Sequence, residues 1–255
     1  MANDLQRTKE WFLQRKGKIT ASECYVLLNN SKVAMTEDEL KAWKEANPKS
    51  RVTTKEVPFS TGTYSYLDEK IAEFYMPDNA YLEYLELCKY ETKAMQWGTY
   101  WEEEARNKYS LEMGYDIVDA PFIPLKGYEK FAGGSPDGIN KDENGIIEIK
   151  CPFNPATHLK YLLFEKPEDL LEEVEQYYVQ CQYNMMCVEL EKGTPITFCD
   201  FVSFDSRTTA TKKLKVLRIP KDEEMQKKLM ERTALAVEYI KQQMDKIDNV
   251  ATIIK

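Results

Sequence analysis

The stretch Gly133–Lys150, GGSPDGINKDENGIIEIK, constrains the fold more than any other part of this sequence. Side chains of a β-strand alternate between its two faces, so Glu148 and Lys150 share one face while the isoleucines beside them point into the core. Turn-forming residues lie before Asp137 and again before the strand, and they predict a hairpin that folds Asp137 back beside Glu148. Two carboxylates held together in this way form a site for a hard cation.

The composition indicates one globular domain. With 255 residues and 43% hydrophobic content, the chain is long enough for one substantial core, and no segment rich in Pro, Gly or Ser suggests a linker. We therefore expect a single domain over residues 1–255, with a final helix over residues 222–247. Apolar runs of signal-peptide or membrane-span length are missing, so we expect a cytoplasmic protein without a membrane partner. The net charge of −8 argues against non-specific adhesion to nucleic acid.

Six cysteines and a single histidine exclude several kinds of site. The cysteines show no CxxC spacing, so we expect reduced thiols in or near the core and no iron–sulfur cluster. One imidazole cannot build a His-dependent triad, a multi-His zinc site or a ββα-metal nuclease centre, and His158 is expected at the surface or as a helix cap. The sequence has no GxxxxGK[ST] loop, so ATP is not an expected cofactor.

Two segments are locally basic despite the acidic total, namely residues 7–18 and 205–221. Such a charge run is as consistent with a solvated face as with a DNA contact. In the first segment, Thr20 or Ser22 can cap a helix that follows. A helix N-terminus with Arg15 beside it would form a phosphate pocket, and the alternative is a plain corner between two helices.

Two long helices carry further polar candidates. In the helix expected over residues 93–113, Glu102 lies on the apolar stripe, and an acid there needs a partner. That partner would be a metal at the two acids of the hairpin, or instead an arginine or a helix cap. In the helix expected over residues 175–188, Gln180 could hydrogen-bond a water or a phosphate at the metal centre.

The remaining pattern predicts further helices and short strands. Helices are expected over residues 4–16, 36–46 and 64–74, and from residue 167. Strands are expected over residues 115–118, 121–124 and 130–132, and over 196–203 and 213–219 as a hairpin. Residues 48–58 are expected to form a polar loop that carries no chemistry.

Four blocks with matching order carry a family resemblance: Arg15–Ser22 (RKGKITAS), Trp97–Arg106 (WGTYWEEEAR), Ser135–Pro152 with SPDG and EIKCP at its ends, and Gln180–Tyr183 (QCQY). They resemble the phage lambda exonuclease family, also called YqaJ-like viral recombinases. The family belongs to the PD-(D/E)xK nuclease superfamily, which implies an α/β fold of the α+β type, with a mixed central sheet flanked by helices. Residues 30–93 match no motif and are expected to be a family-variable helical region.

The resemblance implies a single exonuclease domain that degrades linear double-stranded DNA from 5′ to 3′. It implies dependence on Mg²⁺, with two ions per active site and Mn²⁺ as a substitute, and no use of ATP. Mononucleotides would be released, and 3′ overhangs would be left for phage-type recombination by strand annealing. The implied partners are two further copies in a ring-shaped homotrimer and a phage single-strand annealing protein.

The same resemblance implies a role for each matched residue. Metal would be held by Asp137, Glu148, the main-chain carbonyl of Ile149 and, as an additional acid, Glu102. Lys150 and Gln180 would position the attacking water, and the cation beside Lys150 would lower its pKa. The terminal 5′-phosphate would be held by Arg15, Thr20, Ser22 and Ser135.

Three alternatives remain beside this prediction. An iron–sulfur nuclease would need a cysteine pattern that is missing. An endonuclease of the same fold would cut closed circular DNA, and a DNA-end-binding scaffold would lack turnover. For the exonuclease, we expect a basic channel formed by Arg15 and the segment 212–221, with the acidic residues outside it.

Overall fold

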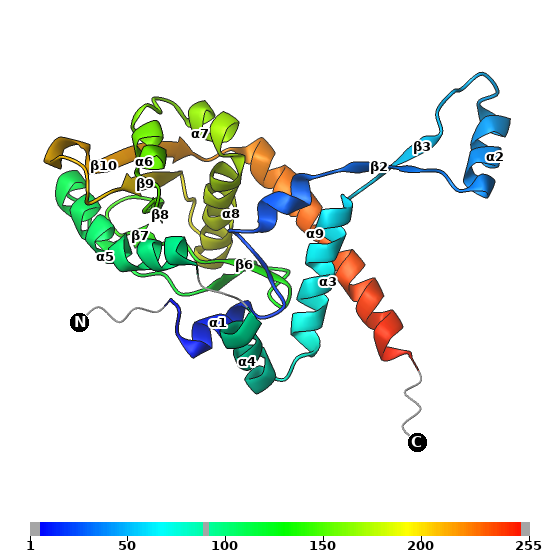
Figure 1. Ribbon diagram of the computed structural model, residues 1–255, viewed down its shortest axis with the longest axis horizontal. Helices are drawn as coiled ribbons and strands as arrows, with labels where there is room; N and C mark the ends of the chain where they lie inside the picture. Colours follow the sequence, from blue (N-terminus) through cyan, green and yellow to red (C-terminus); the bar gives the residue numbers. More distant parts are fainter. Residues whose placement is uncertain (1–5, 89–91, 251–255) are drawn as a thin grey trace.

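The structure, a computed structural model, describes residues 6–88 and 92–250 of the chain (Figure 1). Its central sheet has five strands in the order β10-β9-β8-β7-β4. These strands are β4 (Ile117–Val118), β7 (Gly138–Asn140), β8 (Gly145–Lys150), β9 (Phe198–Phe204) and β10 (Leu214–Pro220). β8 runs parallel to β9, and the other neighbours are antiparallel. The predicted mixed sheet flanked by helices is confirmed.

Helices α5 (Lys93–Met113) and α8 (Glu175–Lys192) cover opposite faces of β8. Ile147 belongs to an apolar cluster that contains Tyr109 of α5, whereas Ile146 belongs to the larger cluster that contains most of the buried apolar side chains of α8. The prediction that β8 meets a core on one face only was wrong. A central strand between two layers of helix is buried on both faces, and Glu148 is therefore only 1% exposed.

A small second sheet ties the N-terminal segment to the predicted hairpin. It has the order β1-β6-β5, formed by β1 (Ile19–Thr20), β6 (Ala132–Gly134) and β5 (Ile123–Pro124). β1 lies parallel to β6, so helix α1 (Lys9–Arg15), just before β1, comes close to the residues that precede Asp137. This pairing between segments more than a hundred residues apart positions the basic N-terminal segment at the hairpin.

The helix predicted to begin at Thr20 or Ser22 is a short 3₁₀-helix, η1 (Cys24–Leu28). Its N-cap is Glu23, and no side chain caps it, so the predicted cap was wrong. Thr20 belongs to β1, and its hydroxyl instead donates to the carboxylate of Glu23 over 3.1 Å.

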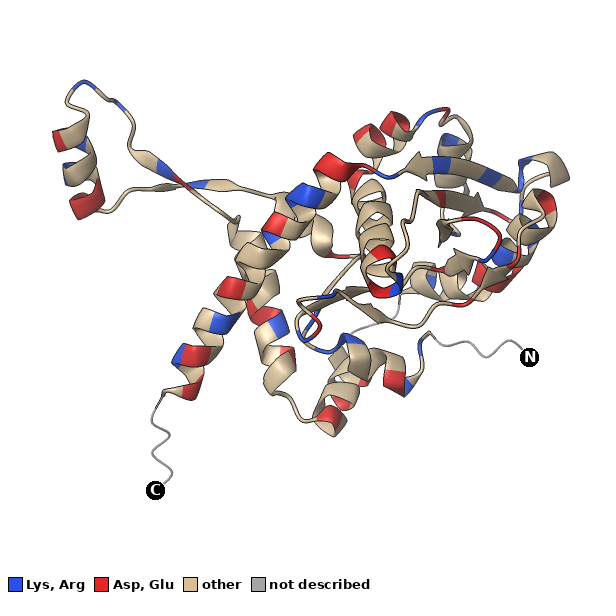
Figure 2. Cartoon of the chain, turned by 180° about the vertical axis from the view of Figure 1, so that it is seen from behind, with Lys and Arg blue, Asp and Glu red and all other residues tan. Residues whose placement is uncertain are grey.

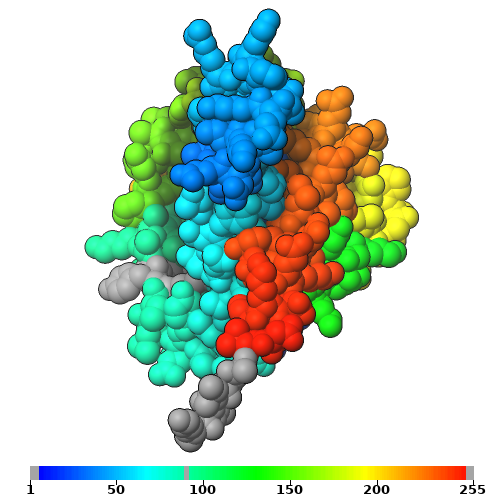
Figure 3. All heavy atoms as spheres, turned by 90° about the vertical axis from the view of Figure 1, so that its right-hand side faces the viewer, coloured from blue at the N-terminus to red at the C-terminus, as the bar shows by residue number. Residues whose placement is uncertain are grey.

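An arm projects from the body of the molecule (Figures 1 and 3). It consists of β2 (Ser31–Ala34), α2 (Glu37–Ala46) and β3 (Thr54–Val57), with β2 and β3 antiparallel. The helix predicted over 36–46 is confirmed, and Thr36 and Glu39 form its capping box. The polar loop predicted over 48–58 was wrong in part, because β3 lies within it. Its partner strand is some twenty residues earlier in the chain, so no local pattern reveals the pairing.

The other helices are α3 (Thr61–Tyr75), α4 (Asp78–Cys88), α6 (Pro155–Leu162), α7 (Pro167–Glu173), the 3₁₀-helix η2 (Ala210–Lys212) and α9 (Glu223–Asp248). Asp222 caps α9 through a hydrogen bond from Met225 N, as predicted. Helices α3 and α9 lie side by side below the arm in Figure 3. In the described part of the chain, none of the helices has the length and apolarity that a membrane crossing requires.

His158 is buried on α6 rather than exposed, which corrects the prediction. Its Nδ1 is 2.8 Å from the hydroxyl of Ser203, and its Nε2 is 2.7 Å from the main-chain carbonyl of Lys212. The ring therefore joins α6 to β9 and to the segment before β10. A single histidine gives no sequence signal for such tertiary partners.

Candidate active site

A cavity of about 620 Å³ opens beside the ends of β7 and β8. The segment before α1, the start of α5, the turn after β8, α6 and the start of α8 contribute to its walls. All the predicted site residues except Thr20 line it: Arg15, Ser22, Glu102, Ser135, Asp137, Glu148, Ile149, Lys150 and Gln180. Segments that are far apart in the sequence thus meet where the hairpin was predicted to hold a cation.

The β7–β8 hairpin places Asp137 beside the end of β8, as predicted. Gly138 pairs with Ile147 across the two strands, and Asp137 immediately precedes this pair. One oxygen of Asp137, Oδ2, accepts a hydrogen bond of 2.6 Å from the backbone N–H of Ile149. Burial raises the pKa of Asp137, against the lowering effect of Lys150 and of the Ile149 hydrogen bond.

Glu148 is fully enclosed and has a partner for each oxygen. Its Oε1 lies 2.6 Å from Lys150 Nζ, and its Oε2 accepts a hydrogen bond of 3.0 Å from the side-chain amide of Asn184 on α8. Burial, together with the negative charge of Asp137, raises the pKa of Glu148 from its ordinary value of 4.5 to about 8. The strand position of Glu148 was predicted, but Asn184, which follows Gln180 by one helical turn, was not.

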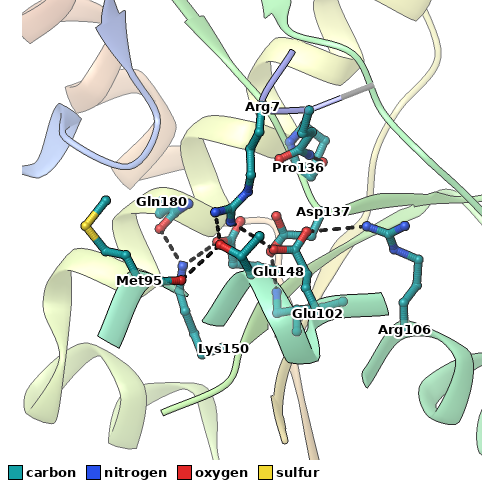
Figure 4. A network of polar contacts seen from close by, with 12 residues as sticks. Arg7, Met95, Glu102, Arg106, Pro136, Asp137, Glu148, Lys150 and Gln180 are labelled. Carbon is teal, nitrogen blue, oxygen red and sulfur yellow. Dashed lines mark hydrogen bonds and ion pairs between the residues drawn. The ribbon is translucent and has the colours of Figure 1, made fainter. Parts of the chain in front are cut away.

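Lys150 donates to Gln180 Oε1 over 3.2 Å as well as to Glu148, and its Nζ lies 4.6 Å from the ring centre of Tyr177 (Figure 4). Burial lowers the pKa of Lys150, but the charges of Glu148 and Asp137 outweigh burial and raise it well above its ordinary value. The lowering predicted for Lys150 depends on a cation beside it and stays a prediction; in this arrangement two carboxylates are the neighbours of the ammonium. Lys150 is therefore held as a cation that donates hydrogen bonds.

Glu102 faces the same cavity from α5, and arginines flank it on two sides. Its Oε2 is 3.2 Å from Arg7 Nη2, and its Oε1 is 3.4 Å from Arg106 Nη2 (Figure 4). The prediction that this acid needs a partner is confirmed, and the partners are arginines, which was the alternative to a metal. Within residues 6–88 and 92–250, no three acidic, histidine or cysteine side chains already converge closely enough to hold a metal ion.

The donor set nonetheless suits a hard cation. Asp137 and Glu148 offer carboxylate oxygens from adjacent strands, and the charge of each raises the energy of the other when both are ionised. A divalent cation between them would relieve that repulsion, and oxygen atoms are the ligands that Mg²⁺ prefers.

Arg15 forms a pocket with Trp11 and two hydroxyls. Its guanidinium stacks 4.2 Å from the ring centre of Trp11, and it lies 3.4 Å from Ser135 Oγ and 3.5 Å from Ser22 Oγ. The indole N–H of Trp11 donates to the same Ser135 Oγ over 3.2 Å. Burial lowers the pKa of Arg15, with Glu23 acting in the opposite direction. Arg15, Ser22 and Ser135 were predicted to lie in one pocket. Trp11 was not, because its position in the sequence indicated only an apolar contact.

Thr20 contacts a residue of this pocket but does not line the cavity itself. It is buried, and its hydroxyl lies 3.2 Å from Ser22 Oγ. The structure therefore places Thr20 where it can orient Ser22 but not where it lines the cavity.

Among the described residues of one chain, Arg15 and residues 212–221 do not line a common cavity, so the predicted basic channel stays a prediction for an assembly of several copies. None of residues 212–221 lines the cavity, and β10 is the edge strand of the sheet, on the upper side of the body in Figures 1 and 2, whereas α1 lies on its lower side. Arg218 on this strand is paired with Asp200 over 2.9 Å, and Lys221 is paired with Glu189 over 2.8 Å. Two of the five basic residues of the segment, Arg218 and Lys221, are thus paired with acids within the fold.

With this geometry established, the family can be assigned. Residues 10–191 match the model of the YqaJ-like viral recombinase domain. The chain belongs to this family. No curated relative matches the sequence of this YqaJ-like protein.

Solved structures share the fold of the YqaJ-like chain over nearly its whole length. The crystal structure of an alkaline exonuclease from Laribacter hongkongensis, LHK-Exo, is 25% identical, with a TM-score of 0.67 and coverage of 96% of this chain and 98% of that chain. LHK-Exo in complex with dAMP aligns with 23% identity and the same TM-score and coverage. A phage-related exonuclease from Haemophilus somnus is 17% identical, with a TM-score of 0.57 and coverage of 90% and 96%.

Proposed function

We propose that this YqaJ-like protein is a Mg²⁺-dependent exonuclease that degrades linear double-stranded DNA from 5′ to 3′. It would release mononucleotides and leave 3′ overhangs for recombination by strand annealing. The observation that carries the proposal is one cavity that contains Asp137, Glu148 and Lys150 together with the pocket of Arg15. The alkaline exonuclease from Laribacter hongkongensis, similar over 96% of this chain, supports the exonuclease activity alone.

Mg²⁺ would be held by Asp137, Glu148 and the main-chain carbonyl of Ile149, with Glu102 as a further ligand and two ions per site. Mn²⁺ would substitute, since it accepts the same oxygen ligands. When bound, Mg²⁺ supplies positive charge for the oxygens of the reacting phosphate. Asp137 is suited to this role because its backbone hydrogen bond leaves one of its oxygens directed to the cavity.

Lys150 and Gln180 would hold the attacking water. Lys150 keeps its proton beside two carboxylates, so it would position the water and stabilise negative charge rather than accept a proton. Gln180 is only 8% exposed and is 3.2 Å from Lys150 Nζ, so both side chains are fixed before substrate arrives. Such preorganisation is the usual source of electrostatic catalysis.

The 5′-to-3′ direction of digestion would be determined by the pocket of Arg15. A guanidinium with two hydroxyls beside it matches a terminal phosphate, and Ser135 lies two residues before Asp137. A strand whose 5′-phosphate occupies this pocket would place its first phosphodiester near the acids. LHK-Exo with bound dAMP is consistent with a site that accepts a mononucleotide. The ring-shaped homotrimer and the annealing partner stay predictions from the family resemblance.

The test uses linear duplex DNA with or without a 5′-phosphate, incubated with Mg²⁺ or with a chelator, and closed circular duplex as a control. The expected result is release of mononucleotides from linear DNA only, faster when the 5′-phosphate is present, and no reaction with chelator. Internal fragments or cutting of the circle would establish an endonuclease instead. Binding of DNA ends without any product would establish a scaffold.

A further inference from the structure

The residues just before α1 line the cavity, and one of them, Arg7, contacts Glu102. Gln6 is buried, and its side-chain amide donates a hydrogen bond of 3.0 Å to the main-chain carbonyl of Pro136, the residue before Asp137. The next residue, Arg7, has a φ of 62°, which side-chain-bearing residues rarely adopt. Unfavourable backbone conformations of this kind persist where surrounding contacts hold them in place. The backbone at Arg7 is therefore fixed so that its side chain points at the catalytic acids.

The guanidinium of Arg7 forms hydrogen bonds with two side chains on one face of α5. Nη2 is 3.2 Å from Glu102 Oε2, and Nη1 donates to the hydroxyl of Thr99, one turn earlier. Figure 4 shows Arg7 and Arg106 approaching Glu102 from opposite sides. The positive charge of Arg7 also acts on Asp137, whose pKa it lowers along with Lys150 and Arg106. Arg7 thus brings positive charge into the cavity that Asp137 and Glu148 line.

The two arginines at Glu102 are not equivalent. Arg106 also forms an ion pair with Asp119, and its side chain is 14% exposed. The side chain of Arg7 is 37% exposed and comes from an N-terminal segment rather than from a packed helix. If Glu102 turned away, Arg106 would keep a carboxylate partner and Arg7 would be released towards the cavity. A guanidinium is suited to this exchange because it binds carboxylate and phosphate with the same planar geometry.

We propose that Arg7 is a displaceable counterion: it holds Glu102 while the cation site is empty, and it transfers to a phosphate of the DNA strand when Glu102 turns to a bound divalent cation. This inference rests on the proposed function, because it requires a cation site at Asp137 and Glu148. A cation and the guanidinium compete for one carboxylate and repel each other. Occupation of the site by metal would therefore make Arg7 available to substrate, and binding of the two ligands would be coupled.

The first test is calorimetric titration of the DNA-free protein with Mn²⁺. Because Arg7 competes with the cation, Arg7→Ala should bind Mn²⁺ more tightly than wild type, by roughly two- to fivefold, as expected for loss of a partly exposed ion pair. Arg7→Lys should lie between them, and Lys9→Ala, an exposed change of the same charge on α1, should match wild type. Unchanged or weaker binding by Arg7→Ala would overturn the inference. Failure of wild type to bind Mn²⁺ would instead overturn the proposed metal site.

The second test separates a displaceable arginine from a simple DNA contact. In the background of Lys150→Ala, which removes turnover, the affinity for a 5′-phosphorylated duplex is measured with Mn²⁺ and with chelator. Adding Arg7→Ala should weaken binding with Mn²⁺ and leave binding with chelator unchanged, because Arg7 is then held by Glu102. An equal loss under both conditions would contradict the transfer of Arg7.

Discussion

At the scale of single residues, Glu148 is a buried carboxylate whose surroundings fit the proposed role of a cation ligand. Its two carboxylate oxygens accept hydrogen bonds from Lys150 and Asn184. The negative charge of Asp137 destabilises the ionised form of Glu148. The ionised form of Glu148 is therefore high in energy, and a nearby positive charge would lower that energy. The same environment explains why a neutral residue of this shape would fit without disturbing the fold.

Glu148→Gln is expected to lower the rate of digestion of linear duplex by roughly 100-fold or more, which is the loss typical of removing one group that stabilises a transition state. The folded state should be retained, because the amide keeps the shape of the acid. Steady-state kinetics and circular dichroism measure the two effects, with Glu191→Gln on the exposed end of α8 as the control. Activity close to wild type in Glu148→Gln would exclude this carboxylate from the chemistry.

Asn184→Ala tests the residue that orients Glu148. The side-chain amide of Asn184 is fully buried, and its Oδ1 has no hydrogen-bond partner in the described part of the chain. Loss of the hydrogen bond from Nδ2 should weaken Mn²⁺ binding by about 10- to 100-fold, which is typical for groups that orient metal ligands. Calorimetry measures this change, and Cys187→Ala, a truncation in the core of the same helix, controls for loose packing. Equal weakening in both variants would assign the effect to packing.

The sequence predicted the acids, Lys150, Gln180 and the pocket of Arg15, because each lies on a strand, helix or turn with a strong local pattern. It did not predict Arg7, Trp11 or Asn184 as members of the site. The contacts of Arg7 and Trp11 cross about 90 to 130 positions of the chain and depend on the pairing of β1 with β6. Asn184 lies on a helix buried nearly all round, where no polar face distinguishes it.

At the scale of elements, the long helices and the β9–β10 hairpin follow the sequence pattern, whereas the short strands do not. Helix α5 begins and ends at the predicted residues, and its C-cap is Gly114 in the left-handed conformation. Strands β1, β2 and β3 were missed, since they have two to four residues and are defined by partners elsewhere in the chain. Such short strands are stabilised by hydrogen bonds to distant segments, so the residues next to them in the sequence do not predict them.

The arm is expected to be dispensable for folding of the body. None of the residues of α2 is buried, and at the base of the arm Ser60 N donates to Asn29 O over 2.9 Å, so the two ends already meet. Replacing residues 31–57 by two glycines should leave the unfolding cooperative, with a midpoint within a few degrees of wild type. Thermal unfolding followed by circular dichroism measures this. A broad transition or loss of the folded signal would show that the arm stabilises the body.

At the scale of the whole molecule, the raised pKa of Glu148 makes stability depend on pH. Burial and the charge of Asp137 raise that pKa from 4.5 to about 8, so between these values the folded chain binds more protons than the unfolded chain. The free energy of unfolding of the metal-free protein should therefore fall as pH rises through this window and level off above it. Denaturant unfolding at several pH values measures the slope, and Glu148→Gln should flatten it. A slope of the opposite sign would contradict the assignment.

The parallel pairing of β8 with β9 also determines when the protein becomes active during its own synthesis. Glu148 lies on β8, but Gln180 and Asn184 follow on α8, and β9 ends at Phe204. At roughly 5–20 residues per second, the ribosome adds these segments some seconds after the acids. Until β9 is inserted, the strand that carries Glu148 lacks a neighbour on one side. A nascent or truncated chain that stops before Phe204 should therefore be harmless to DNA, whatever acidic residues it already contains.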